Sequence, residues 1–135
     1  MKLFIAPIIF LLLINTTIAQ GIPQSLLGDW KPISYENLKT GEILNRPEHS
    51  DIIVSFLENG RFKANACNGI NCSYSITEKF ITLDSCMLRT KRGCLKWDGI
   101  METSLGNESP LEYHFRLDIV ELISKDEFVI KMKRI

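Results

Sequence analysis

The sequence is poor in proline and has no excess of charge of either sign. Of 135 residues, 5 are proline, and 16 Lys and Arg residues balance 16 Asp and Glu residues. A chain without net charge has no long-range attraction to nucleic acid or to an anionic membrane. We therefore expect no nucleic-acid partner.

Signatures of catalysis and of metal binding are also missing. The sequence has no nucleophile-and-base arrangement and no glycine-rich phosphate loop. Zinc sites favour closely spaced ligand pairs, whereas the four cysteines are separated by 4, 13 and 7 residues and His49 and His114 lie in unrelated segments. We expect no metal, no cofactor and no enzymatic activity. An enzyme whose scattered carboxylates converge in space is the alternative that stays open.

The one long apolar run lies at the start of the chain. Lys2 precedes an apolar stretch from Leu3 to Ile14, and small and polar residues follow. This pattern predicts a cleaved signal peptide over residues 1–19, with Thr17 and Ala19 before the cleavage point. The run is shorter than the roughly 20 residues of a membrane-spanning helix. We expect a secreted or periplasmic protein without a membrane span after cleavage.

The mature part, residues 20–135, has the size of a single domain. Its alternating segments predict a strand over 26–37, hairpins over 51–67 and 72–86, one strand over 111–123 and a last strand over 128–132. Apolar residues at helical spacing, which predict one short helix before the last hairpin, are Trp97, Met101 and Leu105. The predicted fold is mainly β: a small antiparallel curled sheet or barrel of about seven strands with this helix.

The loop length of the first hairpin decides which side chains face each other. A two-residue loop would place Leu57 opposite Phe62. A three-residue loop over 58–60 instead places Phe56 opposite Phe62 and Val54 opposite Ala64. We predict the second register because it gathers the apolar residues on one face and places glycine in the left-handed position. In the second hairpin, the same argument predicts pairs of Tyr74 with Leu83 and of Ile76 with Ile81.

Several short patterns, in their order and spacing, resemble those of the META domain family, which includes the bacterial heat-shock protein HslJ. They are Leu27-Gly28-x-Trp30, Phe56-x-x-x-Gly60, Cys67-Asn68, Tyr74, Thr90-x-x-x-Cys94 and a helix ending at Leu105. Ala66, Cys72 and Asp98 stand where the family has Gly, Gly and Glu. The resemblance implies a META-like, lipocalin-like β domain over residues 20–135 with an envelope and stress association and no defined catalytic chemistry.

An even number of cysteines in a small exported domain predicts disulfides, and four cysteines permit three connectivities. The resemblance implies the pair Cys67–Cys94, which leaves Cys72–Cys86. The predicted register places Cys72 opposite Ser85, so this second pair requires a β-bulge.

The remaining candidate residues have a structural and a functional interpretation. Asn68 is typical of a tight turn, with the mouth of a pocket as the alternative. Trp30 and Trp97 are predicted core residues, while Ala64 and Ala66 either make room for the helix or line a cavity. We expect a filled interior, and hence an exported accessory or binding protein with an unknown protein partner. The alternative is a lipocalin-like carrier of a small apolar ligand, with these four residues in its pocket.

Thiol counting tests the predicted disulfides. Because all four cysteines are expected to be paired, alkylation of the denatured, unreduced protein should label none of them, as measured by mass spectrometry. Two or four labelled cysteines would contradict the disulfide prediction.

Overall fold

Antiparallel strand pairing organises the part of the chain that the computed structural model describes, residues 26–88 and 93–135. Residues 1–19, which are predicted to be a signal peptide, lie outside these residues. Thr90, which is part of the resemblance to META domains, also lies outside them. The elements are β1 (Gly28–Asn37), β2 (Ile43–Asn45), β3 (Val54–Phe56), β4 (Arg61–Ala64), β5 (Ile70–Ile76), β6 (Phe80–Leu88), α1 (Lys96–Leu105), β7 (Leu111–Arg116), β8 (Ile119–Ser124) and β9 (Phe128–Arg134).

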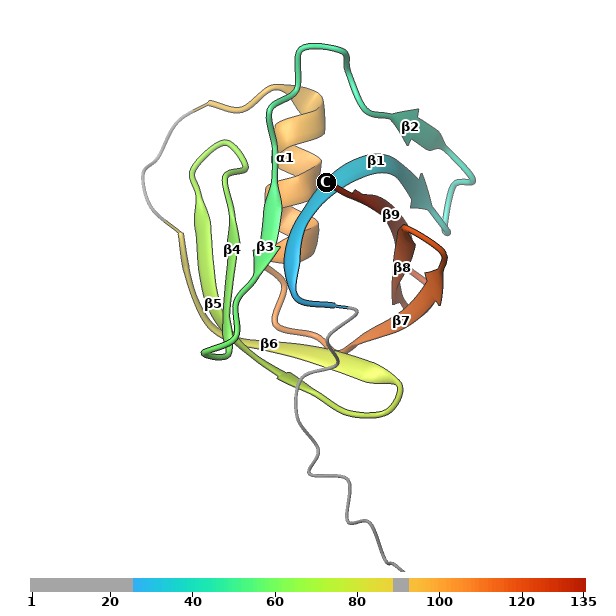
Figure 1. The fold of residues 1–135 in the computed structure, drawn as a ribbon. Coiled ribbons are helices and arrows are strands. Elements are labelled where there is room, and N and C mark those ends of the chain that lie inside the picture. Colours follow the sequence, from blue (N-terminus) through green and yellow to red (C-terminus); the bar gives the residue numbers. More distant parts are fainter. Residues whose placement is uncertain (1–25, 89–92) are drawn as a thin grey trace, which may run out of the picture.

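The strands form a closed barrel. Among the described residues, eight strands follow one another in the order β1, β3, β4, β5, β6, β7, β8 and β9, and β9 pairs with β1 again. β2 lies outside this ring and pairs with the second half of β1. Figure 1 shows the ring, with the first and last strands side by side. The predicted mainly β fold with one helix is confirmed.

The predicted hairpin registers are confirmed. Phe56 pairs with Phe62 and Val54 pairs with Ala64, as the three-residue loop requires. Gly60 has a φ of 76°, the left-handed conformation for which glycine was expected in this loop. The second hairpin likewise pairs Tyr74 with Leu83. Alternation of apolar residues over a few positions was therefore sufficient to define both registers.

The bulge required by the second disulfide is present. The pairing of β5 with β6 shifts between Asn71 and Ser73, and Ser85 adopts a φ of 52°. The extra residue brings Cys86 rather than Ser85 to Cys72. Their Cα atoms lie 4.1 Å apart, and the two sulfurs are bonded.

The helix packs its apolar face against the core. Trp97, Met101 and Leu105 are buried, as their spacing predicted. β6 and β7 share only the pairs Phe80–Glu112 and Ile81–Leu111, so most of β6 has no neighbour on that side within the described residues. Figure 1 shows α1 running behind β1 and β3.

One predicted strand is in fact two. The segment 111–123 is divided into β7 and β8 by a turn at Leu117 and Asp118. Leu117 has a φ of 56° and its side chain is 98% exposed. The turn carries none of the Gly or Asn residues that usually mark such hairpins, so the alternation continues through it unchanged. The short strand β2 was also not predicted from the sequence.

The interior of the barrel is filled with large side chains. The largest fully buried ones are Trp30, Phe56, Phe62, Leu26, Ile52, Ile81, Leu83, Met101, Leu105, Leu111, Leu122 and Ile130. The Phe56 ring makes edge contacts with Phe62 and Tyr74 at centroid distances of 5.1 and 5.3 Å. An eight-stranded barrel is wide enough either for side chains to fill or for one small ligand. The expectation of a filled interior agrees with this packing.

Tyr74 fastens the first hairpin loop to β5. Its backbone N–H donates to Gly60 O at 2.8 Å, and its hydroxyl donates to Leu57 O, also at 2.8 Å. Burial raises the pKa of the Tyr74 hydroxyl above its ordinary value. The backbone N–H and the side-chain hydroxyl of Tyr74 therefore both hold the loop that contains Gly60.

Leu117→Gly should raise the free energy of unfolding by about 0.5–1 kcal/mol. A left-handed conformation costs a non-glycine residue about 1–2 kcal/mol, which exceeds the entropy that glycine adds to the unfolded chain. The exposed leucine side chain contributes little packing. Urea denaturation measures the change. The control is Ile119→Gly in β8, where φ is not positive, and it should destabilise; a destabilising Leu117→Gly contradicts the prediction.

Tyr74→Phe should lower stability by about 1 kcal/mol at neutral pH, because the hydrogen bond to Leu57 O is lost. The raised pKa means that the folded state retains the hydroxyl proton when the unfolded state has released it. This contribution is complete below the unfolded pKa of about 10 and is lost as pH rises through the folded pKa.

The stabilities of wild type and Tyr74→Phe should therefore converge above about pH 10 when urea denaturation is repeated across this range. Burial and Glu78 also raise the pKa of Tyr113, which adds the same alkaline loss to both proteins. If the difference in stability between the two proteins does not change with pH, the proposed contribution of the Tyr74 hydroxyl is wrong.

Candidate functional site

The four residues proposed for an internal pocket are part of the packed core. Trp30, Ala64, Ala66 and Trp97 are 0%, 4%, 2% and 5% exposed. The indole N–H of Trp30 donates to Leu26 O at 2.8 Å. The indole N–H of Trp97 has no acceptor within hydrogen-bonding distance in the described structure. Of these four residues, only Ala64 also borders one of the surface pockets described below.

The start of β1 is fixed by Arg134 of the last strand. The guanidinium of Arg134 lies over the Trp30 ring, 4.2 Å from its centroid, and donates to Leu27 O at 2.9 Å. Gly28 has a φ of 113°, and an added Cβ would lie 3.5 Å from the Arg134 guanidinium. The pattern Leu27-Gly28-x-Trp30 thus has a structural role, because it seats one end of the barrel against β9.

The segment Cys67-Asn68 joins the β4–β5 loop to the helix. Cys67 is disulfide-bonded to Cys94, with 5.6 Å between their Cα atoms, as the family resemblance implied. The Asn68 amide donates to both carboxylate oxygens of Glu102 in α1 at 3.0 Å. Gly69 has a φ of 69° at the tight corner that follows. The turn interpretation of Asn68 accounts for its position, and Glu102 is the partner that the sequence analysis missed.

A surface groove runs along α1 where the helix lies beside β1. Two pockets, of about 370 and 210 Å³, share Tyr35, Thr103 and Ser104, and we call this pair the helix groove. The further lining residues are Cys94, Leu95, Lys96, Gly99 and Ile100 in the first pocket and Asn37, Lys39, Asn107, Glu127 and Phe128 in the second. The groove lies outside the barrel and combines apolar with polar side chains.

Aromatic packing and an ion pair give the helix groove a defined shape. Tyr35 stacks on Phe128 with 5.7 Å between ring centroids and an interplanar angle of 27°. Lys96 Nζ lies 3.0 Å from Glu42 Oε1, which links the helix to the β1–β2 connection. No sequence motif indicated a function for these residues, because they converge from separate segments of the chain.

A separate pocket, of about 340 Å³, lies beside the Cys67–Cys94 disulfide. Its lining residues are Asp51, Asn65, Cys67, Gly93, Leu95 and Asp98. Arg46 lies nearby and donates to Pro32 O and Ile52 O at 2.9 Å and to Ser50 O at 2.7 Å. Burial lowers the pKa of the Arg46 guanidinium, while Asp51 and Asp98 oppose that shift. This pocket, which we call the acidic pocket, offers carboxylates to a cation.

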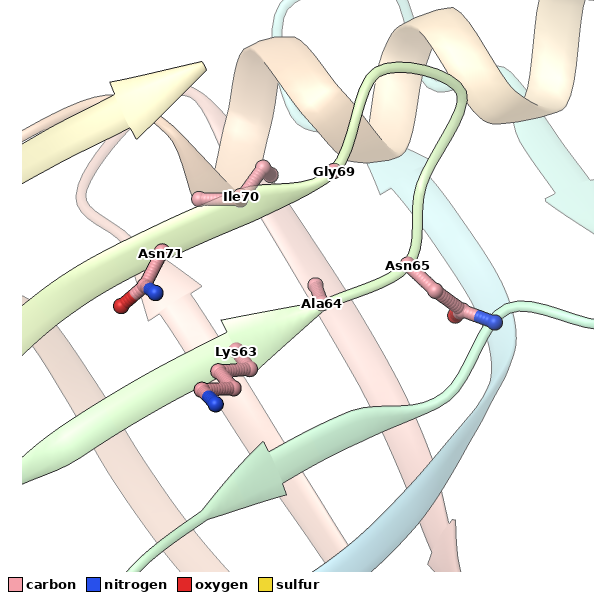
Figure 2. A pocket seen from close by; sticks show the side chains of 6 residues that line it. All are labelled: Lys63, Ala64, Asn65, Gly69, Ile70 and Asn71. Atoms are coloured by element: carbon pink, nitrogen blue, oxygen red, sulfur yellow. The ribbon is translucent and has the colours of Figure 1, made fainter. Parts of the chain in front are cut away.

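A further depression, of about 250 Å³, lies between β4 and β5. Figure 2 shows Lys63 and Asn71 projecting to one side of the hairpin and Ala64 and Ile70 to the other. The Asn71 amide oxygen accepts a hydrogen bond from Arg61, which also donates to Ser73 Oγ at 3.0 Å. These polar side chains already bind one another on an outward-facing sheet surface, so the depression is less suited to a ligand than the helix groove.

The two histidines lie outside these pockets. His49 is exposed, and His114 Nε2 lies 3.2 Å from Glu112 Oε1 on an exposed sheet face. His114 is therefore a solvated outer residue. Among the helices that the structure describes, none has the length and apolar character needed to cross a membrane.

Comparisons with known proteins agree with the architecture. No family model matches the sequence, and no curated protein matches it. An NMR structure of a protein from Burkholderia xenovorans has a TM-score of 0.63 and 15% identity, covering 83% of this chain and 85% of that one. A lipocalin-like protein from Bacteroides uniformis has a TM-score of 0.57 and 15% identity, covering 82% and 99%. A DUF4847 family protein from Bacteroides vulgatus has a TM-score of 0.57 and 10% identity, covering 83% and 95%.

At these identities the likeness concerns the fold alone. This chain therefore has a lipocalin-like fold, while the resemblance to META domains stays a prediction from the sequence.

Proposed function

We propose that this chain is an exported, non-catalytic binding protein that holds an elongated, partly apolar ligand in the helix groove. The observation that carries the proposal is the contrast between the interior and this surface. The barrel axis is occupied by buried side chains such as Phe56, Phe62 and Met101, whereas the pockets along α1 are open. A ligand therefore binds beside the barrel rather than inside it.

The size of the helix groove supports this assignment. Small-molecule sites typically have volumes of about 300–1,000 Å³ and are mostly apolar, with a few polar groups that fix orientation. The larger pocket alone has about 370 Å³, and the adjoining one extends it past Tyr35. The two together suit a ligand that is longer than it is wide.

The lining of the groove indicates the chemical class of the ligand. Tyr35 and Ile100 offer an aromatic ring and an aliphatic chain, which suit an apolar body. Asn37 and Lys39 offer amide and ammonium groups at the other end, which suit a polar or anionic head. An amphiphile with one apolar chain satisfies both ends.

Export is supported by the two disulfides. Disulfides persist in oxidising compartments, and both cysteine pairs of this chain are bonded. The apolar N-terminal run with its small-residue cleavage point supports the same route. A narrower version of this proposal is that the exported protein acts in the cell envelope and in the stress response, as the META resemblance implies.

The second candidate is a carrier with its ligand inside the barrel. It is favoured by one observation, the likeness in fold to a lipocalin-like protein from Bacteroides uniformis. The buried aromatic residues would then have to move apart to admit the ligand. The two candidates predict contacts with different residues.

Amide NMR with decanoate as a probe distinguishes them. Because decanoate combines an apolar chain with an anionic head, it should shift the amide signals of Tyr35, Gly99 and Thr103. Thr103→Arg should weaken binding by at least about tenfold, since the exposed side chain at 103 borders both pockets and the longer one fills them. Ser75→Arg, on the exposed face of β5, adds the same charge elsewhere and serves as the control.

Two results would contradict the groove assignment. Shifts centred on Phe56 and Phe62 would favour the internal carrier. Equal affinities of wild type and Thr103→Arg, or the absence of shifts at the groove, would exclude the groove as the decanoate site.

A further inference from the structure

We propose that Cys67, Cys94 and Glu102 form a zinc site when the disulfide between the two cysteines is reduced. The proposal does not rest on ligand binding in the helix groove, although Cys94 also lines that groove. It rests on the side chains gathered where the β4–β5 loop meets α1.

The ligand atoms are already close together. One sulfur from each cysteine and one oxygen of Glu102 all lie within 4.8 Å of one another. Cys94 Sγ is 3.4 Å from Glu102 Oε2. In a tetrahedral site with Zn–S bonds of about 2.3 Å and Zn–O bonds of about 2.0 Å, a sulfur and an oxygen ligand are roughly 3.5 Å apart. Cys94 and Glu102 therefore already span one edge of such a tetrahedron.

The donor set is chemically suited to zinc. Thiolates and carboxylates are both common zinc ligands, and three protein ligands leave a fourth position for water. The Asn68 amide donates to both oxygens of Glu102 at 3.0 Å. Hydrogen bonds of this kind orient a ligating group and tune its affinity for the metal. Asn68 thus acts as a positioning residue for Glu102.

The framework around the site does not depend on the disulfide alone. Ala66 and Ile70 flank the loop that carries Cys67, and both are buried. Met101 and Leu105 anchor the helix that carries Glu102. The Cα atoms of the two cysteines are 5.6 Å apart, so after reduction side-chain rotation allows the sulfurs to separate to roughly 3.8 Å, the sulfur–sulfur distance in a tetrahedral zinc site.

The site is accessible from solvent through the acidic pocket. Cys67 lines this pocket together with Asp51 and Asp98, whose carboxylates attract cations. Cys67 and Cys94 are each half-buried, whereas the other disulfide joins the fully buried Cys72 to the half-buried Cys86. A reductant in solution can therefore reach both sulfurs of the Cys67–Cys94 bond but only one sulfur of the Cys72–Cys86 bond.

The chemical step is a thiol–disulfide exchange followed by metal binding. A dithiol supplies two electrons and two protons, the Cys67–Cys94 bond breaks to give two thiols, and the dithiol closes into its own disulfide. Zn²⁺ then displaces both thiol protons to solvent and binds the two thiolates and the Glu102 carboxylate. The same two cysteines therefore hold either a cross-link or a metal ion.

Cobalt binding after mild reduction tests the proposal. The folded protein is treated with dithiothreitol, the reagent is removed under nitrogen, and Co²⁺ is added as a spectroscopic substitute for Zn²⁺. Reduced wild type should bind one equivalent with thiolate-to-cobalt charge-transfer absorption, which Zn²⁺ abolishes. Unreduced wild type should show no such absorption, because its sulfurs remain bonded to each other.

Three variants separate this site from other metal binding. Cys67→Ser/Cys94→Ser retains the core disulfide and should show no thiolate absorption after the same treatment. Glu102→Gln should weaken binding by about tenfold or more, since even the loss of a ligand's hydrogen-bonding partner costs about 10- to 100-fold. Glu58→Gln, in an exposed hairpin loop, should leave the affinity unchanged.

Several results would overturn the proposal. These are Co²⁺ binding without thiolate absorption, equal binding by Cys67→Ser/Cys94→Ser, and an unchanged affinity in Glu102→Gln. Circular dichroism monitors the fold throughout. A reduced protein that unfolds and does not refold with Zn²⁺ also rejects the site.

Discussion

Backbone hydrogen bonding between the first and last strands joins the two ends of the described chain and closes the sheet. β1 pairs with β9 from Trp30–Arg134 to Asn37–Phe128, and Arg134 adds its contacts with the Trp30 ring and Leu27 O. Closure leaves β1 and β9 without a free edge over this length. It also fixes the barrel diameter, since an eight-stranded ring has room along its axis for side chains or for one small ligand, and large side chains are buried there in this protein.

The filled interior moves the candidate chemistry to the outside of the barrel. The apolar face of α1, with Trp97, Met101 and Leu105, completes the core. Its other face lies beside β1, where Tyr35 and Thr103 border the helix groove. The helix that seals the core thus also creates the surface site. The side chains that stabilise the core are therefore different from those that are available for binding at the surface.

The two disulfides lie in different surroundings. Cys72–Cys86 bridges neighbouring strands at a bulge, with Cys72 fully buried. Cys67–Cys94 connects a loop to the start of the helix, beside Glu102 and the acidic pocket. Burial restricts access to the Cys72 side of the first bond, whereas both cysteines of the second bond are half-buried.

Local sequence determined the parts of this protein whose partners lie nearby in the chain. Side-chain alternation specified the Phe56–Phe62 and Tyr74–Leu83 registers, because a one-residue slip would turn every apolar side chain outward. The need for a bulge followed only when the second register was combined with the Cys72–Cys86 pairing that the family resemblance implied. It did not reveal the turn at Leu117, where no glycine or asparagine interrupts the pattern. Only the tertiary structure decided barrel closure, the approach of Glu102 to Cys94 and the helix groove beside Tyr35. These contacts depend on how whole elements pack, and periodicity specifies which face of an element is apolar but not which other element that face meets.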